Sequence, residues 1–493
     1  MHRNRLLLPL AGALALAACS SDRAEVVAPT SAPHAGAEVS TLVPGRYMVL
    51  AGAGGFGSDF ASRVAALGGT VEQQHAGAGF AVVSGLTATS ASQVAGIAGI
   101  TNVVQDAEYA LDTPASIEAD ASDVQAGDAI ASQANPATAA RYAWQWNMRL
   151  IQADKAWAAG KLGNAGVTVA ILDTGLDYTI PDLNGLVDLS RSTSVIATDN
   201  AIRATYFPTR NDVTDFNGHG TNVATQVSSK APVHAGVTSK TTLIGVKVLN
   251  WQGHGNTSTT LAGLLWAADH GADVANMSLG GGFLKAGNGL ELAALNRVLG
   301  YVNAKGMLVV VAAGNDAINL DHDSNYTASY CDQPHVICVT AVGPTTFTGE
   351  GDTPSFYTNF GRSSVDVAGP GGNAQVDATG TPNLVSAWPW GLGVASWVWS
   401  YCPKDRIASI NATTGVPTLT VCAAGNRVSG FIGTSQATPH VAGLAALLVA
   451  EMGHGRPSQI KAAIQQSADD RGQPGDDPYF GRGRINVAKA LGL

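Results

Sequence analysis

The sequence has little charge and no long hydrophobic run. Only 13% of its 493 residues are charged, and lysines and arginines do not cluster, so nucleic acid is not the expected partner. The longest uncharged apolar run, residues 6–18, is too short for a membrane span, which needs roughly 20 residues. We therefore expect no transmembrane helix. Hydrophobic residues make up 45% of the chain, which indicates a globular protein with a large core.

The N-terminus has the pattern of an export signal. Arg3 and Arg5 precede the apolar run, which ends in small residues before Cys19, so residues 1–19 are interpreted as a secretory signal peptide. The ending Leu-Ala-Ala-Cys resembles a bacterial lipobox, in which the cysteine is acylated and becomes the new N-terminus. We expect a cell-envelope lipoprotein that meets the membrane only through a lipid on Cys19. An ordinary alanine-rich signal with a chance cysteine is the alternative.

Cysteine is otherwise scarce. Cys331, Cys338, Cys402 and Cys422 form an even set in an exported chain, which indicates two disulfides. Sequence order favours Cys331 with Cys338 and Cys402 with Cys422. Four cysteines allow three connectivities, and the spacing does not decide between them.

Four segments follow the signal peptide. Residues 20–44 are rich in Ala, Ser and Pro without an apolar period, so we expect a flexible tether. Residues 45–111 have strand and helix patterns in the order βαββαβ, which predicts a small ferredoxin-like domain. Residues 112–141 return to Ala, Ser, Asp and Gln, which indicates a protease-accessible linker. Residues 142–493 predict an α/β domain with a mainly parallel sheet flanked by helices. Its expected strands are residues 167–172, 242–249, 272–277, 307–312 and 336–342.

Three residues that can take part in catalysis lie in separate motifs of the α/β domain. Asp173 follows the strand run 167–172, at the edge where parallel sheets place their sites. His219 lies between glycines at the start of a helical stretch, and Ser435 lies at the start of an apolar helix. Each has an ordinary alternative, because turns, surface loops and helix caps use the same residue types.

The three motifs together are more specific than each alone. The chain order Asp, His, Ser is that of the subtilisin arrangement and differs from the chymotrypsin and hydrolase orders. With Ala-Ile-Leu-Asp-Thr-Gly around Asp173, His-Gly-Thr at His219 and Gly-Thr-Ser at Ser435, residues 142–493 resemble a subtilisin-like serine peptidase (subtilase, peptidase family S8). Residues 45–111 resemble the inhibitory propeptide of that family. The resemblance implies a self-processed zymogen, secreted after processing, with protein or peptide substrates and its own propeptide as partners.

The resemblance also assigns roles. His219 takes the proton of the Ser435 hydroxyl and returns it to the leaving amine through an acyl-enzyme mechanism, while Asp173 fixes the imidazole tautomer. The oxyanion donors are the Asn315 side chain and the backbone N–H of Ser435.

The oxyanion asparagine has a second candidate, because Ala-Ala-Gly-Asn occurs twice. Asn315 ends the copy that follows the strong strand 308–311, so its side chain is expected to project from a strand end across the cleft. Asn426 ends the copy after Cys422, in a stretch that resembles a disulfide-tied hairpin. We therefore prefer Asn315.

Two glycine-rich segments are expected to hold the substrate. In the family, the segments corresponding to Ser278, Leu279 and Gly280 and to Gly253 and Gly255 sandwich an extended peptide through main-chain hydrogen bonds. Glycine suits this task because it lets backbone approach backbone. Without the triad, two ordinary turns would be the simpler interpretation.

Departures from the family pattern affect packing and metal binding. Asn222 and Thr225 stand where the family commonly has His and Gly. Residues 228–238 lack an oxygen-ligand string where the family often binds calcium, and Asp177 and Asp182 are too few for a cation that takes six to eight ligands. No metal site or cofactor is therefore assigned, and structural calcium is left open.

A tryptophan-rich segment, residues 371–429, is longer than the family core needs. We expect a hairpin packed on the body, and an aromatic rim that binds substrate is the alternative. Trp397, Trp399 and Tyr401 fall on one face of a strand. The other two tryptophans considered are Trp388 and Trp390.

The leading hypothesis is a monomeric, active serine endopeptidase. A catalytically silent binding lipoprotein on the same fold is the alternative, and its signature would be the loss of a triad residue. An esterase is disfavoured because Gly-Thr-Ser at Ser435 is not the G-x-S-x-G elbow. The sequence does not predict the preference of the first specificity pocket.

Overall fold

The computed structural model describes residues 41–120, 127–280, 283–284, 289–321, 326–327, 330–345, 351–375, 396–425 and 427–493. The predictions for the signal peptide, for Cys19, for Trp388 and Trp390, and for Asn426 lie outside these residues. No helix within the described ranges is long and apolar enough to cross a membrane.

The N-terminal domain has the predicted βαββαβ order. Its four strands form an antiparallel sheet in the order β2-β3-β1-β4, which confirms the ferredoxin-like fold. Its elements are β1 (Thr41–Ala51), α1 (Phe60–Ala66), β2 (Thr70–His75), β3 (Phe80–Ser84), α2 (Ala88–Ala95) and β4 (Ile100–Ala110).

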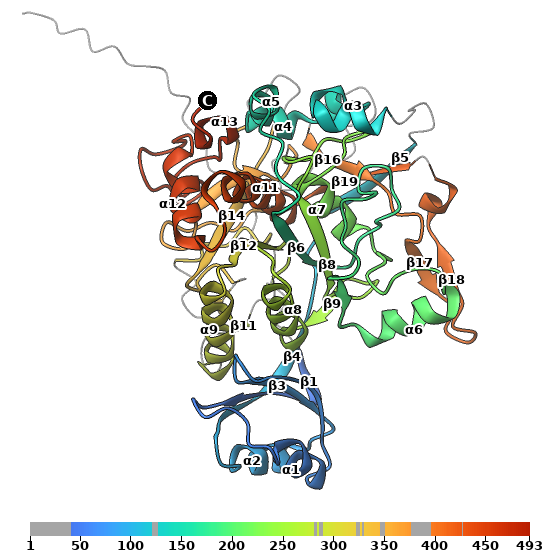
Figure 1. Cartoon of the computed structure of the whole chain (residues 1–493), viewed down its shortest axis with the longest axis vertical. Coiled ribbons are helices and arrows are strands. Elements are labelled where there is room, and N and C mark those ends of the chain that lie inside the picture. The colour runs from blue at the N-terminus through green and yellow to red at the C-terminus, as the bar shows by residue number, and fades with distance from the viewer. Residues whose placement is uncertain are drawn as a thin grey trace, which may run out of the picture.

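Both faces of this sheet are buried, because its side chains alternate between two hydrophobic clusters. Tyr47 and Val49 of β1 pack with Phe60 and the rest of the domain's own core under α1 and α2. Met48 and Leu50 pack instead in a cluster shared with the main domain. Figure 1 shows this domain in blue at the lower end of the molecule, directly below two helices of the main domain.

The main domain is built on a seven-stranded parallel sheet, which confirms the predicted fold class. The order is β15-β14-β12-β10-β6-β8-β7, and every adjacent pair is parallel. All five predicted strands lie in it. The strands are β6 (Thr168–Asp173), β7 (Thr193–Ser194), β8 (Thr242–Lys247), β10 (Val274–Met277), β12 (Leu308–Ala312), β14 (Val336–Val342) and β15 (Val367–Pro370).

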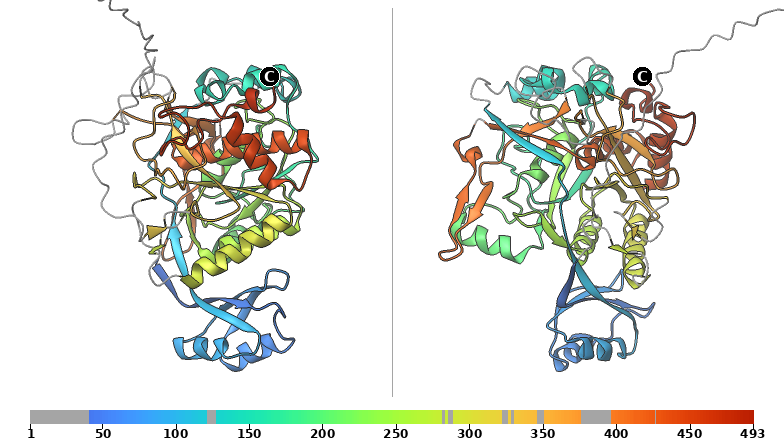
Figure 2. Two further views of the ribbon diagram at one scale, coloured as in Figure 1. Left: turned by 90° about the vertical axis from the view of Figure 1, so that its left-hand side faces the viewer. Right: turned by 180° about the vertical axis from the view of Figure 1, so that it is seen from behind.

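Helices cover both faces of the sheet. Residues of α7 (His219–Val227) and α11 (Thr434–Met452) belong to one large core cluster, and residues of α8 (Thr257–Asp269) and α9 (Gly289–Ala304) belong to the other. Figure 2 shows these layers from the side and from behind. Strand β6 lies between β10 and β8, so the strand order changes direction at β6. Parallel α/β sheets open a binding crevice at the carboxyl ends of the strands at such a point.

The remaining elements lie around this body. They are α3 (Ala129–Ala134), α4 (Trp146–Leu150), α5 (Ala153–Ala158), α6 (Ala197–Tyr206), α12 (Pro457–Ser467) and α13 (Val487–Ala490), and the strands β5 (Ala115–Asp120), β9 (His254–Asn256), β11 (Phe283–Leu284), β13 (Tyr326–Thr327), β16 (Val398–Tyr401), β17 (Ile407–Ile410), β18 (Pro417–Leu419) and β19 (Arg427–Ile432).

The predicted linker, residues 112–141, contains regular structure. Strand β5 pairs antiparallel with β19 in a three-stranded sheet of order β16-β19-β5, and α3 follows later in the segment. Composition did not indicate a strand here, because the pairing depends on the exposed edge of β19 and not on an apolar pattern in β5.

The two disulfides favoured by sequence order are present, one joining Cys331 to Cys338 and the other Cys402 to Cys422. Trp397, Trp399 and Tyr401 are buried in the main core, so these residues support the packed hairpin and not the exposed aromatic rim.

Candidate active site

Asp173 and His219 form a buried pair at the carboxyl edge of the sheet. Asp173 is the last residue of β6, and His219 is the first residue of α7. The His219 Nδ1 atom lies 2.8 Å from Asp173 Oδ1, and both side chains are fully enclosed. Asp173 accepts at Oδ1, so Nδ1 carries the proton and Nε2 has a lone pair available as a base.

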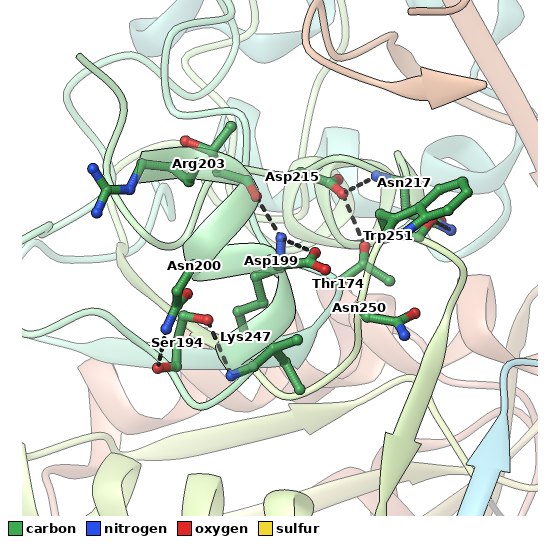
Figure 3. A network of polar contacts seen from close by, with 12 residues as sticks. Thr174, Ser194, Asp199, Asn200, Arg203, Asp215, Asn217, Lys247, Asn250 and Trp251 are labelled. Carbon is green, nitrogen blue, oxygen red and sulfur yellow. Dashed lines mark hydrogen bonds and ion pairs between the residues drawn. The ribbon is translucent and has the colours of Figure 1, made fainter. Parts of the chain in front are cut away.

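A second carboxylate, Asp215, holds the loop that carries His219. Asp215 accepts hydrogen bonds from the backbone N–H groups of Asn217, Gly218 and Thr221 and from the hydroxyl groups of Thr174 and Thr221. Figure 3 shows Asp215 reaching both Thr174 and Asn217. The sequence motifs did not point to Asp215. The signal was a short acidic side chain a few residues before a helix start, where unpaired N–H groups need an acceptor.

An ion pair without solvent contact lies behind the same loop. The Lys247 ammonium of β8 is 2.8 Å from Asp199 Oδ2 of α6, and both side chains are fully buried. Lys247 also donates to the carbonyl oxygen of Thr214 at 2.8 Å and lies over the Phe216 ring. Lys247 is the strand neighbour of Asp173, because β8 pairs with β6 in this register. The ion pair between Lys247 and Asp199 therefore ties α6 to the strand end beside the site.

Ser435 lies in the first turn of α11, which packs beside α7. The next residue, Gln436, donates from Nε2 to Asn222 Oδ1 of α7 at 3.2 Å, so the first turns of the two helices are adjacent. The Ser435 hydroxyl donates to the carbonyl oxygen of Ser278 at 3.0 Å. The buried His219 Nε2 has no hydrogen-bond partner among the described residues. The second predicted link of the triad, from Ser435 to His219, is therefore not formed in this conformation.

Asn315 lies just after the end of β12, and its side chain connects Thr434 with Asp112. Its Oδ1 accepts from the backbone N–H and the hydroxyl of Thr434, the residue before Ser435, at 2.8 and 2.9 Å. Its Nδ2 donates to the carbonyl oxygen of Asp112 at 2.8 Å. The preceding Gly314 has φ +96°, and a Cβ there would lie 2.4 Å from Asn359, so only glycine fits this turn.

The segment before Asp112 lies along β9 as an added strand. Strand β4 pairs antiparallel with β9, with Tyr109 opposite Gly255, and the Leu111 N–H donates to the Gly253 carbonyl oxygen at 2.9 Å. A Cβ on Gly255 would lie 2.5 Å from Leu249. The structure thus brings the predicted glycines against an extended backbone that leads directly to Asn315.

Tyr109 of β4 is buried where this strand meets the main domain. Its side chain is buried among residues of α8 and β8, and its hydroxyl bonds to the Thr260 hydroxyl. Burial raises the pKa of Tyr109 well above its ordinary value, with a smaller contribution from Tyr330.

The other predicted binding segment, Ser278 to Gly280, contacts Ser435 through Ser278. Ser278 exchanges two hydrogen bonds with Ser435, because its own hydroxyl also donates to the Ser435 carbonyl oxygen at 2.6 Å. Leu279 is buried. Strand pairing of 278–280 with residues 109–112 stays a prediction.

The carboxylates considered as calcium ligands are occupied by protein donors. Asp182 is buried and accepts from the backbone N–H of Val233 and of His234, with His234 Nδ1 3.2 Å away. Asp177 accepts from Thr179. One cluster of potential metal ligands is found within the described ranges, Glu118 with Cys402 and Cys422, and its two sulfurs already form a disulfide.

The fold and the site define a serine peptidase on a parallel α/β sheet. The profile described as the Subtilase family matches residues 164–483. The chain belongs to this family, and it is a serine endopeptidase. Thermitase of Thermoactinomyces vulgaris is 31% identical over 70% of this chain and 95% of its own length. The thermophilic serine proteinase of Bacillus sp. (strain AK1) is 32% identical over 71% of this chain and 67% of its own.

Solved structures agree on the fold. The epidermin leader peptide processing serine protease of Staphylococcus aureus matches with a TM-score of 0.66 at 21% identity, over 91% of this chain and 98% of that one. Fervidolysin of Fervidobacterium pennivorans, described as a keratinolytic enzyme related to subtilisin, matches with a TM-score of 0.63 at 20% identity, over 95% of this chain and 65% of that one. The family assignment favours the active enzyme over the catalytically silent lipoprotein.

Proposed function

We propose that this chain is the zymogen of an exported serine endopeptidase that cuts itself at the bond between Asp112 and Thr113. The observation that carries the proposal is the hydrogen bond from Asn315 Nδ2 to the Asp112 carbonyl oxygen, because it aims an amide donor at one particular peptide bond beside Ser435. Asp173, His219 and Ser435 are the proposed triad.

The proposed reaction begins with a rotation of the Ser435 hydroxyl. The hydroxyl leaves the Ser278 carbonyl oxygen and turns toward His219 Nε2, which is buried and has a lone pair to accept the proton. Ser435 Oγ then attacks the Asp112 carbonyl carbon, and the oxygen gains negative charge facing Asn315 Nδ2. His219 passes the proton to the Thr113 nitrogen as that bond breaks, while Asp173 stabilises the imidazolium. Water then releases the Asp112 carboxyl group from Ser435.

The N-terminal domain is the proposed inhibitor after this cut. Its last strand is bound to β9, so the new carboxyl end at Asp112 is held at the site as a bound product. Asp106 of β4 adds to the binding between the N-terminal domain and the peptidase domain. Its buried carboxylate accepts from the Ser258 N–H in the first turn of α8, where the helix dipole favours an anion.

Charged side chains add a second contact between the two domains. Asp269, the last residue of α8, accepts hydrogen bonds from His75 of β2 at 2.7 Å, from Tyr301 of α9 and from Lys305, the residue after α9. Burial by itself would raise the pKa of Asp269, but the hydrogen bonds from His75, Tyr301 and Lys305 outweigh burial and lower the pKa to about 2.

Processing would also release the enzyme from the membrane. Export and a lipid on Cys19 are proposed from the sequence of residues 1–19. A cut after Asp112 separates Cys19 from all three triad residues, so the peptidase domain stays at the membrane only while the cleaved N-terminal domain still binds it.

The proposal is tested by sequencing and by active-site labelling. Purified enzyme should begin at Thr113 and react with a fluorophosphonate probe. The Ser435→Ala variant should lose labelling and retain the uncut bond, whereas Ser458→Ala, at an exposed serine of α12, should behave as wild type. A Ser435→Ala protein that still cuts itself at this bond would contradict the proposed mechanism.

A further inference from the structure

The chain continues along the main domain after the proposed scissile bond. Strand β5 begins two residues beyond Thr113 and pairs antiparallel with β19 along its whole length, from Ala115 opposite Ile432 to Asp120 opposite Arg427. Pro114, between Thr113 and β5, lies against Gly433: a Cβ on that glycine would be 3.5 Å from the proline ring. The residues after the bond are therefore in a fixed register with the site.

Strand β19 is a rigid support for this pairing. It ends at Ile432, just before the helix that carries Ser435, so its distance from the nucleophile is set by the chain itself. Its other edge is paired with β16, and the Cys402–Cys422 disulfide ties the chain that connects the two strands. The edge facing β5 is thus a preformed strand-binding edge, at which main-chain groups can pair with any extended peptide.

Two side chains of β5 make contacts that can confer selectivity. Ile117 packs against the main core cluster, opposite Gly430, which has no side chain to obstruct it. Glu118 forms an ion pair with Arg406, Oε1 to Nη1 at 2.5 Å, and both side chains are mostly buried. Backbone contacts hold Arg406 in place, because the next residue, Ile407, donates its N–H to the Phe216 carbonyl oxygen at 2.8 Å.

We infer that the edge of β19, together with Arg406, is an extended binding site for the leaving-group side of polypeptide substrates, and that β5 occupies it in the precursor. This inference rests on the proposed cut at Asp112–Thr113. After that cut β5 is a strand at a chain terminus, which an incoming polypeptide can displace. The site favours long substrates with an apolar residue at the position of Ile117 and an acidic residue at the position of Glu118.

The test uses processed enzyme and internally quenched peptides. The reference peptide has the sequence of residues 109–120, a second ends after Ser116, and a third carries Glu118→Lys. Wild-type enzyme should cut the reference peptide with a kcat/KM about five- to tenfold above each of the others, the scale of one partly buried ion pair and a few strand contacts. Arg406→Glu should reverse the preference between the Glu118 and Glu118→Lys peptides. Lys161→Glu, on another surface where Lys161 pairs with Glu451, is the matched control and should keep the wild-type ratio.

The outcomes separate this inference from the proposed function. Mass spectrometry of the products shows whether cleavage falls after Asp112, which tests the scissile bond alone. If the bond is cut but all three peptides give equal kcat/KM, the pairing of β5 with β19 belongs to the precursor only and the inference is wrong. A ratio that Arg406→Glu leaves unchanged would also overturn it, since the charge of Arg406 would then play no part.

Discussion

The side-chain amide of Asn315 donates a 2.8 Å hydrogen bond to the main-chain carbonyl oxygen of Asp112, a residue 203 positions earlier in the chain. The same side chain is held from its other end by Thr434, next to Ser435. Asn315 therefore connects the proposed scissile bond with the helix that carries the proposed nucleophile. The geometry suits an oxyanion donor, because the amide is fixed before charge develops on the carbonyl oxygen.

Asn315→Ala should lower kcat by about 100- to 1000-fold with little change in KM, the loss known for this kind of donor in subtilisin, a member of the same family. The measurement is steady-state hydrolysis of a peptide with the sequence of residues 109–120. A large rise in KM with unchanged kcat would show instead that Asn315 binds the ground state.

Ser435→Ala and His219→Ala should each remove nearly all activity, and the double variant should be little slower than either one. The reason is that proton transfer and attack form one step, so losing one partner disables the other. Single-turnover rates of the three variants provide the check, and multiplicative losses would contradict the coupled role.

Asp269→Asn should speed the loss of the cleaved N-terminal domain at neutral pH. Despite burial, hydrogen bonds from His75, Tyr301 and Lys305 lower the pKa of Asp269 to about 2, and of these donors His75 is the one in the N-terminal domain. The charged carboxylate therefore holds His75 at neutral pH, and this contribution to the complex is lost as the pH falls through about 2. Co-elution of the two fragments, followed from pH 7 to pH 2, should show a difference between wild type and variant that disappears near pH 2. A difference that persists unchanged at pH 2 would exclude this carboxylate as the cause.

His440 should make the free energy of unfolding depend on pH. Burial lowers the pKa of His440 from 6.5 to about 4, outweighing its hydrogen bond to the Gln436 carbonyl oxygen. The unfolded chain therefore binds a proton between about pH 6.5 and 4 that the folded chain does not. Stability should fall across this range as the pH drops, by on the order of 3 kcal/mol.

Urea unfolding in the Ser435→Ala background, which avoids self-digestion, measures this effect. His440→Gln should remove most of the pH dependence over that range, whereas His335→Gln, at an exposed histidine, should keep it. Equal slopes in the two variants would assign the effect to other groups.

Asp199→Ala should destabilise the protein by about 3–5 kcal/mol, because it leaves the Lys247 ammonium buried without its partner. The double change Asp199→Leu with Lys247→Met should cost much less, since it removes both charges and keeps apolar volume. Thermal unfolding of the two variants distinguishes the cases, and a double variant as unstable as the single one would indicate that packing, not charge, is at stake.

The sequence by itself determined the fold class and the three motif residues. Strand 336–342 is buried along its whole length and apolar except for Thr340, because both faces of a parallel sheet are covered, and that pattern is local. Asp173, His219 and Ser435 could be named because each lies in a short string whose glycines and neighbours carry the information. The disulfide order could be favoured because each pair is close in sequence.

Only the tertiary structure decided which peptide bond lies in the site and what surrounds it. Asp112 contributes a carbonyl oxygen, which every residue has, so no side-chain pattern could point to it. Strand β5 and the Lys247–Asp199 pair depend on partners far away in the chain: an open edge on β19 and a helix that meets the sheet. Local composition encodes which segments can be strands or helices, whereas pairing across the chain is set by how the packed layers meet.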